Sequence, residues 1–198
     1  MPFTLAILAC ILAYVWLIEP YVDRAAVIVP IAIVAILAAW HDMRQGDWGL
    51  SWPALVPGLW RALAVTLAAV LLILGTGAIV GTLHDRRDFL GSLAPLVVWG
   101  GAQQWVLQTV VLREAQRASS RRTGILIAAL LFGVVHLPNP LLAPLTAGAA
   151  RIWCWLYDRH PNIIPLALSH GLGTLALRYA FDEAIIGRLR IGASYLRL

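Results

Sequence analysis

Long apolar runs recur along almost the whole chain, and they constrain its fold more than any other feature. Such runs lie at about residues 3–18, 25–40, 62–83, 89–112, 123–137, 141–157 and 163–181. Most of them approach the ~20 residues that a helix needs to cross a hydrocarbon core of ~30 Å. Within a membrane the backbone polar groups must be satisfied inside each segment, which favours helices. The sequence therefore predicts an all-α, polytopic transmembrane helix bundle of about seven spans, between six and eight.

The composition supports a membrane protein. Of the 198 residues, 61% are hydrophobic and only 13% are charged, and the mean hydropathy is +0.80. These values lie far outside the range of soluble domains. The runs 123–137 and 141–157 are short, and Leu137-Pro138-Asn139-Pro140 separates them, so they are candidates for partial or re-entrant helices. We expect an integral protein of the bacterial inner membrane.

The charge distribution gives the expected orientation and excludes one class of partner. The net charge of +5 is spread over loops and tail without a basic stripe, which argues against nucleic-acid binding. The positive-inside rule places the densest basic cluster, in the loop expected after residue 112, in the cytoplasm. That cluster comprises Arg113, Arg117, Arg121 and Arg122, and the opposing bias comes from Arg86, Arg87 and the tail arginines. With seven spans, the amino terminus would be cytoplasmic.

The chain has no long linker and no repeat, so residues 1–198 are expected to form a single integral-membrane domain. Polar residues within the apolar runs concentrate after residue 100. We therefore expect scaffold helices over 1–91, a core with the candidate site over 92–178 and an interfacial tail over 182–198. Trp48, Trp52 and Trp60 are expected at the membrane surface before the third span. Asp158 to Asn162 are expected to form an exposed turn, with His160 facing solvent.

Three of the later runs each contain polar side chains at helical spacing. Gln104 and Gln108 are four residues apart and share a helix face, whereas Gln103 lies about 100° around the helix. His136 follows Phe132 by four residues, so the two rings should stack, and Thr174 follows His170 by four. Glycines beside His170 would allow another helix to approach closely. Polar groups buried in hydrocarbon need partners, which predicts one shared polar site.

The order Q-Q-x-x-x-Q, F-x-x-x-H and H-x-x-x-T resembles the CAAX protease and bacteriocin-processing (CPBP, or Abi) family of intramembrane proteases. Its pattern is E-E-x-x-x-R, then F-x-x-x-H, then H-x-x-x-N or a similar small residue. The resemblance covers roughly residues 92–178, and it includes the LPNP sequence after the first histidine and the approach WLYDRHPNIIPLALSHGL to the second.

The resemblance implies hydrolysis of a peptide bond within the membrane, in a membrane-embedded or lipidated protein or peptide substrate. In the family the first glutamate is thought to activate water, the arginine orients the carboxylates, and the histidines complete the site. Carried over by position, the catalytic residues are Gln103, Gln104, Gln108, His136, His170 and Thr174. Phe132 and Trp105 are expected to contact substrate. The motifs leave the use of a cofactor open; if a divalent metal such as zinc is bound, His136 and His170 are the expected ligands.

The three glutamines change the chemistry that the resemblance implies. A neutral amide cannot accept a proton from water as a carboxylate does, and loss of a general base typically lowers a rate ~10² to 10⁴-fold. The nearest other acid, Glu114, would lie about 15 Å beyond Gln104 along a helix, and Asp182 and Glu183 look interfacial. A histidine could act as the base instead, with the amides as hydrogen-bond donors.

Three functions are thus open. The first is an endopeptidase with an atypical glutamine and histidine site. The second is a catalytically silent relative that binds a transmembrane or peptide partner in a chaperone, immunity or accessory role. The third is a membrane protein that binds haem through His136 and His170. A transporter lacks support, because no repeat of broken helices is present.

Overall fold

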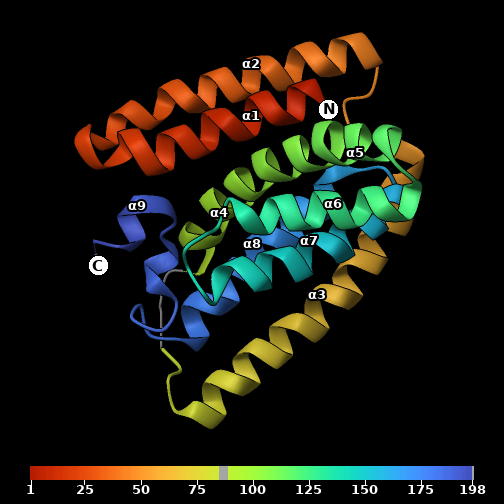
Figure 1. The fold of residues 1–198 in the computed structure, drawn as a ribbon. Helices are drawn as coiled ribbons and strands as arrows, with labels where there is room; N and C mark the ends of the chain where they lie inside the picture. Colours follow the sequence, from red (N-terminus) through yellow and green to blue (C-terminus); the bar gives the residue numbers. More distant parts are fainter. Residues whose placement is uncertain (85–88, 198) are drawn as a thin grey trace. The chain divides into compact units, whose positions relative to one another are not determined.

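The computed structural model describes residues 1–84 and 89–197, and these residues form helices joined by short connections (Figure 1). Within them no β-strand is formed; the single strand-like feature is an isolated bridge between Leu50 and Asn162. The predicted all-α fold is therefore confirmed. Arg86 and Arg87, which bear on the expected orientation, lie outside the described residues.

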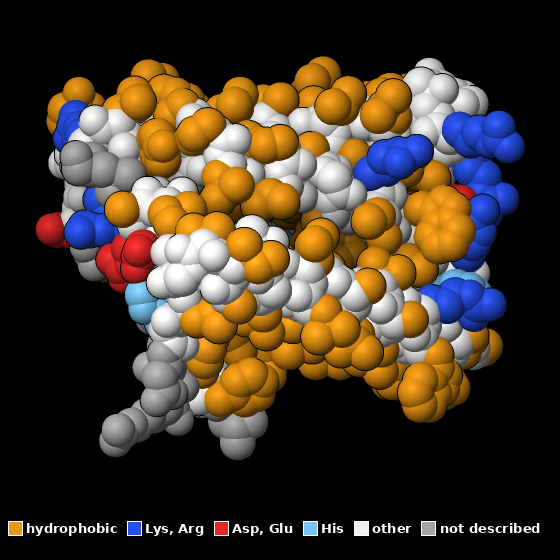
Figure 2. Space-filling model, turned by 90° about the horizontal axis from the view of Figure 1, so that it is seen from below, with side chains coloured by type: hydrophobic (Ala, Val, Ile, Leu, Met, Phe, Trp, Pro, Cys, Tyr) orange, Lys and Arg blue, Asp and Glu red, His pale blue; other side chains and the backbone are white. Residues whose placement is uncertain are grey.

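The first half of the chain forms three helical segments. α1 (Pro2–Ala13) continues as a π-helix (Tyr14–Ile18) and a 3-10 turn (Glu19–Tyr21). A second 3-10 turn (Arg24–Val27) leads into α2 (Ile28–Gln45), and α3 spans Trp52–Val80. The stretches Pro2–Tyr21, Ala25–Gln45 and Trp52–Val80 are each long and apolar enough to cross a membrane. Hydrophobic side chains also cover most of the face seen in Figure 2, as expected for an integral membrane protein.

The second half holds the remaining helices. α4 (Phe89–Trp105) runs on through a π-helix, η4 (Val106–Leu112), into α5 (Arg113–Ala118). α6 spans Arg121–Val134, α7 Leu142–Arg159 and α8 Ile163–Ala180. A 3-10 turn (Gly187–Leu189) and the short α9 (Gly192–Tyr195) end the described chain. Four of the predicted spans correspond to α4 with its continuation, α6, α7 and α8, and their crossing of the membrane stays a prediction.

Helix α3 begins at Trp52, well before the predicted start near residue 62. Pro53 lies in its first turn, where a missing backbone N–H costs nothing, and Gly81 ends the helix in a left-handed conformation. Its 29 residues would extend about 43 Å. Trp52 and Trp60 therefore lie on a helix, where we had expected a surface segment before it.

The loop expected after residue 112 is also mostly helical. Arg113 and Arg117 belong to α5, and Arg121 opens α6 after a break at Ser119 and Ser120. The side chain of Ser120 accepts a hydrogen bond from the backbone N of Thr123 at 3.1 Å, a typical N-cap. The apolar pattern ends at Leu112 although the helix continues, because the helical backbone does not require an apolar face.

The predicted exposed turn at 158–162 is wrong in its extent. Asp158 and Arg159 are the last residues of α7, and His160 is half-buried. Asn162 is 1% exposed. Its Oδ1 atom accepts from the backbone N of Ile164 at 2.9 Å, and its Nδ2 donates to the carbonyl of Ser51 at 3.0 Å. Asn162 therefore caps α8 and ties that helix to the start of α3.

The chain forms two compact units, and each draws on both halves of the sequence. Unit 1 comprises Met1–Trp48, Val106–Cys154 and Leu189–Leu198, and unit 2 comprises Gly49–Trp105 and Trp155–Arg188. This division does not follow the expected boundary between a scaffold over 1–91 and a core over 92–178. In unit 2, α8 packs against both α3 and α4. A Cβ placed on Gly171 would lie 2.7 Å from Cγ2 of Val97, so the absence of a side chain permits the close approach of α8 and α4.

In unit 1 the carboxyl-terminal segment binds the loop that follows α6. The backbone N of Gly192 donates to the carbonyl of Leu137 at 2.8 Å, and Nδ2 of Asn139 donates to the carbonyl of Arg190 at 3.3 Å. Gly192 has a φ of +58°, which a residue with a side chain rarely adopts. The part of the expected interfacial tail from residue 189 onward is thus folded into unit 1.

Candidate active site

The second histidine and one glutamine meet in unit 2. Nε2 of Gln104, on α4, lies 3.4 Å from Nδ1 of His170, on α8. Gln104 is fully buried and His170 is 9% exposed. The two residues are 66 positions apart in the sequence, and their side chains thus form a hydrogen bond in an apolar interior. This is the pairing expected if the glutamine motif and the second histidine motif build one site.

Glycines allow α4 to reach His170. A Cβ on Gly100 would lie 3.0 Å from both Cβ and Cγ of His170, and a Cβ on Gly101 would lie 3.4 Å from Cβ of Ala167. Gly100 precedes Gln104 by four residues and lies on the same helix face. The glycines beside His170 were expected to allow a close approach, whereas Gly100 was not, although the pair Gly100-Gly101 stands one residue before the glutamines.

The other predicted site residues of unit 2 are less buried than Gln104 and His170. Gln103 and Trp105 on α4 are half-buried, and so is Thr174, four residues after His170 on α8. No described contact joins Thr174 or Gln103 to the Gln104–His170 pair. By position, Gln103 corresponds to the family's water-activating glutamate, but it is Gln104 that contacts the histidine.

The first histidine lies in unit 1, at the end of α6. Nδ1 of His136 lies 2.6 Å from the carbonyl oxygen of Phe132, and the two ring centroids are 4.9 Å apart. The predicted stacking within F-x-x-x-H is confirmed. A carbonyl oxygen only accepts hydrogen bonds, so Nδ1 carries the proton and Nε2 of the neutral ring carries the lone pair. His136 is therefore prepared to act as a base through Nε2.

Trp153 supports this arrangement and was missed by the sequence analysis. Its ring, on α7, meets Phe132 edge-on with centroids 6.4 Å apart, and both side chains are mostly buried. A Cβ on Gly133 would lie 2.8 Å from Cβ of Ala147, so small residues bring α6 and α7 together. Spacing within one helix gives no information on a partner from another helix, which is why Trp153 carried no signal.

Asn139 fixes the loop directly after His136. It is 1% exposed, and its Oδ1 accepts from the backbone N atoms of Leu141 and Leu142 at 3.2 and 2.9 Å. It therefore caps the start of α7. With Nδ2 bound to the carbonyl of Arg190, the side chain connects α7 to the carboxyl-terminal segment. The motif LPNP thus holds the backbone that follows the first histidine.

Gln108 lies in the π-helix η4 of unit 1 and is fully buried. The sequence analysis placed it on a regular α-helix. π-helical turns are rare and frequently occur at functional sites. The segment Val106–Leu112 follows Trp105, so the π-helix begins within the glutamine motif.

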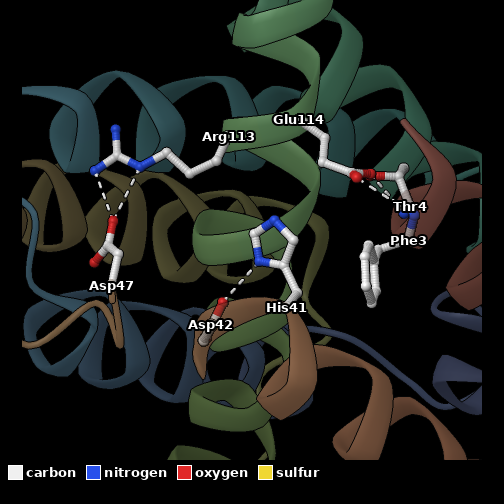
Figure 3. Close-up of polar contacts among 7 residues, drawn as sticks. All are labelled: Phe3, Thr4, His41, Asp42, Asp47, Arg113 and Glu114. Atoms are coloured by element: carbon white, nitrogen blue, oxygen red, sulfur yellow. Dashed lines mark hydrogen bonds and ion pairs between the residues drawn. The ribbon is translucent and has the colours of Figure 1, made fainter. Parts of the chain in front are cut away.

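The first half of the chain also holds buried polar residues, among them His41 and Asp42. Figure 3 shows a group of polar contacts in unit 1, near the ends of α1, α2 and α5. Nδ1 of His41 lies 2.9 Å from Oδ1 of Asp42, and both side chains are nearly inaccessible. These two residues lie beyond the predicted span 25–40, because α2 continues to Gln45.

Glu114 belongs to the same group and has a structural partner. Its carboxylate accepts from the backbone N of Thr4 at 2.8 Å and of Phe3 at 3.3 Å (Figure 3). It thus neutralises the positive end of α1. Arg113 beside it binds Asp47 through Nη2 at 3.2 Å. Glu114 is used to cap a helix and lies in the group of Figure 3, so it does not supply the missing catalytic carboxylate.

Residues 1–84 and 89–197 contain no group of three or more His, Cys, Asp or Glu side chains that could hold one metal ion. Zinc sites normally use three or four such ligands. The amide oxygens of the glutamine motif are weaker metal ligands than the carboxylates in the family's motif. A zinc site through His136 and His170 stays a prediction.

Comparison with known proteins finds a matching family. Residues 87–176 match the family described as type II CAAX prenyl endopeptidase Rce1-like. The match contains all three glutamines, Phe132, both motif histidines and Thr174. No curated protein and no solved structure matches the chain. The matched segment, 90 of the 198 residues, contains the motifs that carry the resemblance to the CAAX protease and bacteriocin-processing family of intramembrane proteases.

Proposed function

We propose that this protein is an intramembrane endopeptidase of the CAAX type, which cleaves a lipidated or membrane-anchored protein or a peptide precursor in the bacterial inner membrane. The observation that carries the proposal is the buried Gln104–His170 contact at 3.4 Å. It preserves a polar link between the first and third motifs although the glutamates are replaced. That both histidines act on one peptide bond rests on the motif order shared with the family.

The protonation states suggest a division of roles. The amide N–H of Gln104 donates to Nδ1 of His170, which places the ring proton of a neutral His170 on Nε2. His170 is then a hydrogen-bond donor, suited to the oxyanion that forms on the scissile carbonyl. His136 has the opposite tautomer, with Nδ1–H bound to Phe132 and Nε2 free to accept a proton from water. Water would attack the carbonyl carbon, and the proton on His136 would pass to the leaving amine.

The test uses a farnesylated peptide with a carboxyl-terminal CAAX sequence and detects the released tripeptide by mass spectrometry. We expect the native protein to cleave it, His136→Ala to lose ~10² to 10⁴-fold in kcat and His170→Ala ~10² to 10³-fold. His84→Ala is the matched control, because His84 lies outside the matched segment and pairs with Asp182 at 2.8 Å. Cleavage that persists in both motif variants would refute the assignment.

A silent relative remains the second candidate, favoured by the replacement of all three charged motif residues by amides. In that case the native protein would bind the peptide without cleaving it. Cleavage would then appear only in the triple variant Gln103→Glu, Gln104→Glu, Gln108→Arg, which restores the general base and its balancing cation. Cleavage by the native protein rules this candidate out.

A further inference from the structure

A basic cluster lies in unit 2, where the start of α3 meets the connection between α7 and α8. The backbone N of Ser51 donates to the carbonyl of Pro161 at 3.0 Å, and Nδ2 of Asn162 donates to the carbonyl of Ser51. A Cβ on Gly58 would lie 3.3 Å from Cβ of His160. These contacts hold the connection firmly against the first turns of α3.

The side chains of Arg61, Arg159 and His160 lie at this junction of α3 with the connection. Arg61 follows Gly58 by three residues and so extends from the same face of α3 that meets His160. Arg159 precedes His160 in the chain. The pKa of His160 lies below its ordinary value of 6.5, through burial first and then through the positive charges of Arg61 and Arg159. Both guanidinium groups are therefore close enough to the imidazole to repel its protonated form.

The two arginines have no acidic partner among the residues that the structure describes. Nη1 of Arg61 donates to the carbonyl of Pro57 at 3.2 Å, and Nη1 of Arg159 to the carbonyl of Trp155 at 3.3 Å. Asp158 is the single acidic residue in the segments 49–61 and 155–163. Each guanidinium group has five donors, so most of them remain available to an anion.

Exposed tryptophans lie on the same two helices as the arginines of the cluster. Trp52 and Trp60 on α3 are 68% and 70% exposed, and Trp155 on α7 is 43% exposed, with the Arg159 guanidinium 4.1 Å from its ring centroid. In membrane proteins, exposed tryptophan marks the interface, at the depth of the lipid headgroups. The anion most abundant at that depth is a lipid phosphate, and arginine binds phosphate through its planar fork.

We propose that Arg61, Arg159 and His160 bind the phosphate of an anionic phospholipid headgroup, with Trp60 and Trp155 beside it at the interface. The site would anchor the junction of α3 with the connection that leads into α8. It does not depend on peptide hydrolysis, and it would serve an enzyme and a silent relative alike.

The test measures lipid binding to the full-length protein in detergent by native mass spectrometry. Phosphatidylglycerol and phosphatidylcholine with identical acyl chains are titrated separately. We expect the native protein to prefer phosphatidylglycerol. In Arg61→Gln/Arg159→Gln, its affinity for that lipid should fall about 10- to 30-fold, from ~1 kcal/mol for each basic residue. Arg61→Lys/Arg159→Lys keeps both charges but loses the planar fork, so its affinity should lie between those of the native protein and the glutamine variant.

The matched control is Arg117→Gln/Arg122→Gln, which removes the same charge from two exposed residues of unit 1. Its affinity for phosphatidylglycerol should stay that of the native protein. An equal loss in the two glutamine variants would show general charge attraction and overturn the proposal, and so would the absence of any lipid preference. Displacement of the lipid by an equal concentration of inorganic phosphate would make free phosphate the ligand and overturn the lipid assignment.

Discussion

At the scale of single residues, the contact between His170 and Gln104 depends on Gly100, because glycine has no Cβ that would collide with the histidine. The imidazole lies against the backbone of α4 at Gly100, one helical turn before the glutamine that binds it. Any larger residue would place its Cβ only 3.0 Å from the Cβ and Cγ atoms through which the His170 ring is attached. The geometry of the candidate site thus depends on a residue that has no chemistry of its own.

Gly100→Ala tests this dependence. Alanine normally stabilises a helix by ~1 kcal/mol relative to glycine, but overpacking at 3.0 Å from His170 costs ~1 to 3 kcal/mol. We expect a lower thermal transition and, since small misplacements of a catalytic group cost up to ~10²-fold, a clear loss of peptide cleavage. Gly101→Ala is the control, because its Cβ would make an ordinary contact at 3.4 Å. Equal behaviour of the two variants would contradict the role of Gly100.

At the scale of elements, α1 depends on a carboxylate from a helix far along the chain. Glu114 on α5 is 110 residues from Thr4, whose backbone N it binds at 2.8 Å. The first turn of a helix has unsatisfied N–H groups, and a negative charge there is favourable. The contact therefore fastens the amino end of α1 to α5 within unit 1.

Glu114→Gln should weaken this attachment without affecting catalysis. The neutral amide can still accept a hydrogen bond but loses the charge, so we expect a stability loss of ~1 kcal/mol, measured as a lower thermal transition in detergent. Glu183→Gln is the control; its ion pair with Arg188 is exposed, and such pairs contribute ~0 to 1 kcal/mol. Cleavage abolished in Glu114→Gln, with the fold intact, would instead make Glu114 the missing base.

At the scale of the whole molecule, helices continue from one compact unit into the other. α7 passes from unit 1 to unit 2 after Cys154, and η4 follows α4 directly at Trp105. Neither unit is a continuous stretch of sequence. We therefore propose that residues 1–198 unfold as one domain despite the two units.

Hydrogen exchange followed by mass spectrometry during stepwise denaturation tests cooperativity. Peptides from α2, in unit 1, and from α3, in unit 2, should lose protection at the same denaturant concentration, because coincident transitions mark two-state behaviour. Peptides from the loop at residues 46–51 are the control for local opening, since they should exchange before either helix. Two well-separated transitions would establish two domains.

Much of the architecture follows from local pattern. The apolar runs predict the all-α membrane fold because a backbone in hydrocarbon must satisfy its own polar groups, and helices do so over ~20 residues. The stacking of Phe132 on His136 follows in the same way, because residues four apart share a helix face. The three motifs, in order, carry a resemblance to the family whose model matches residues 87–176.

Tertiary structure decided the remaining features, since they depend on partners distant in sequence. Spacing places Gln103 and Gln104 on different sides of one helix without naming their partners, and only the packing of α4 on α8 at Gly100 brings Gln104 to His170. In the sequence Glu114 is one charged residue among arginines; in the structure its carboxylate accepts hydrogen bonds from the backbone N–H groups of the first turn of α1. Sequence periodicity determines which face of a helix is polar, whereas the approach of a second helix determines which residue on that face is used.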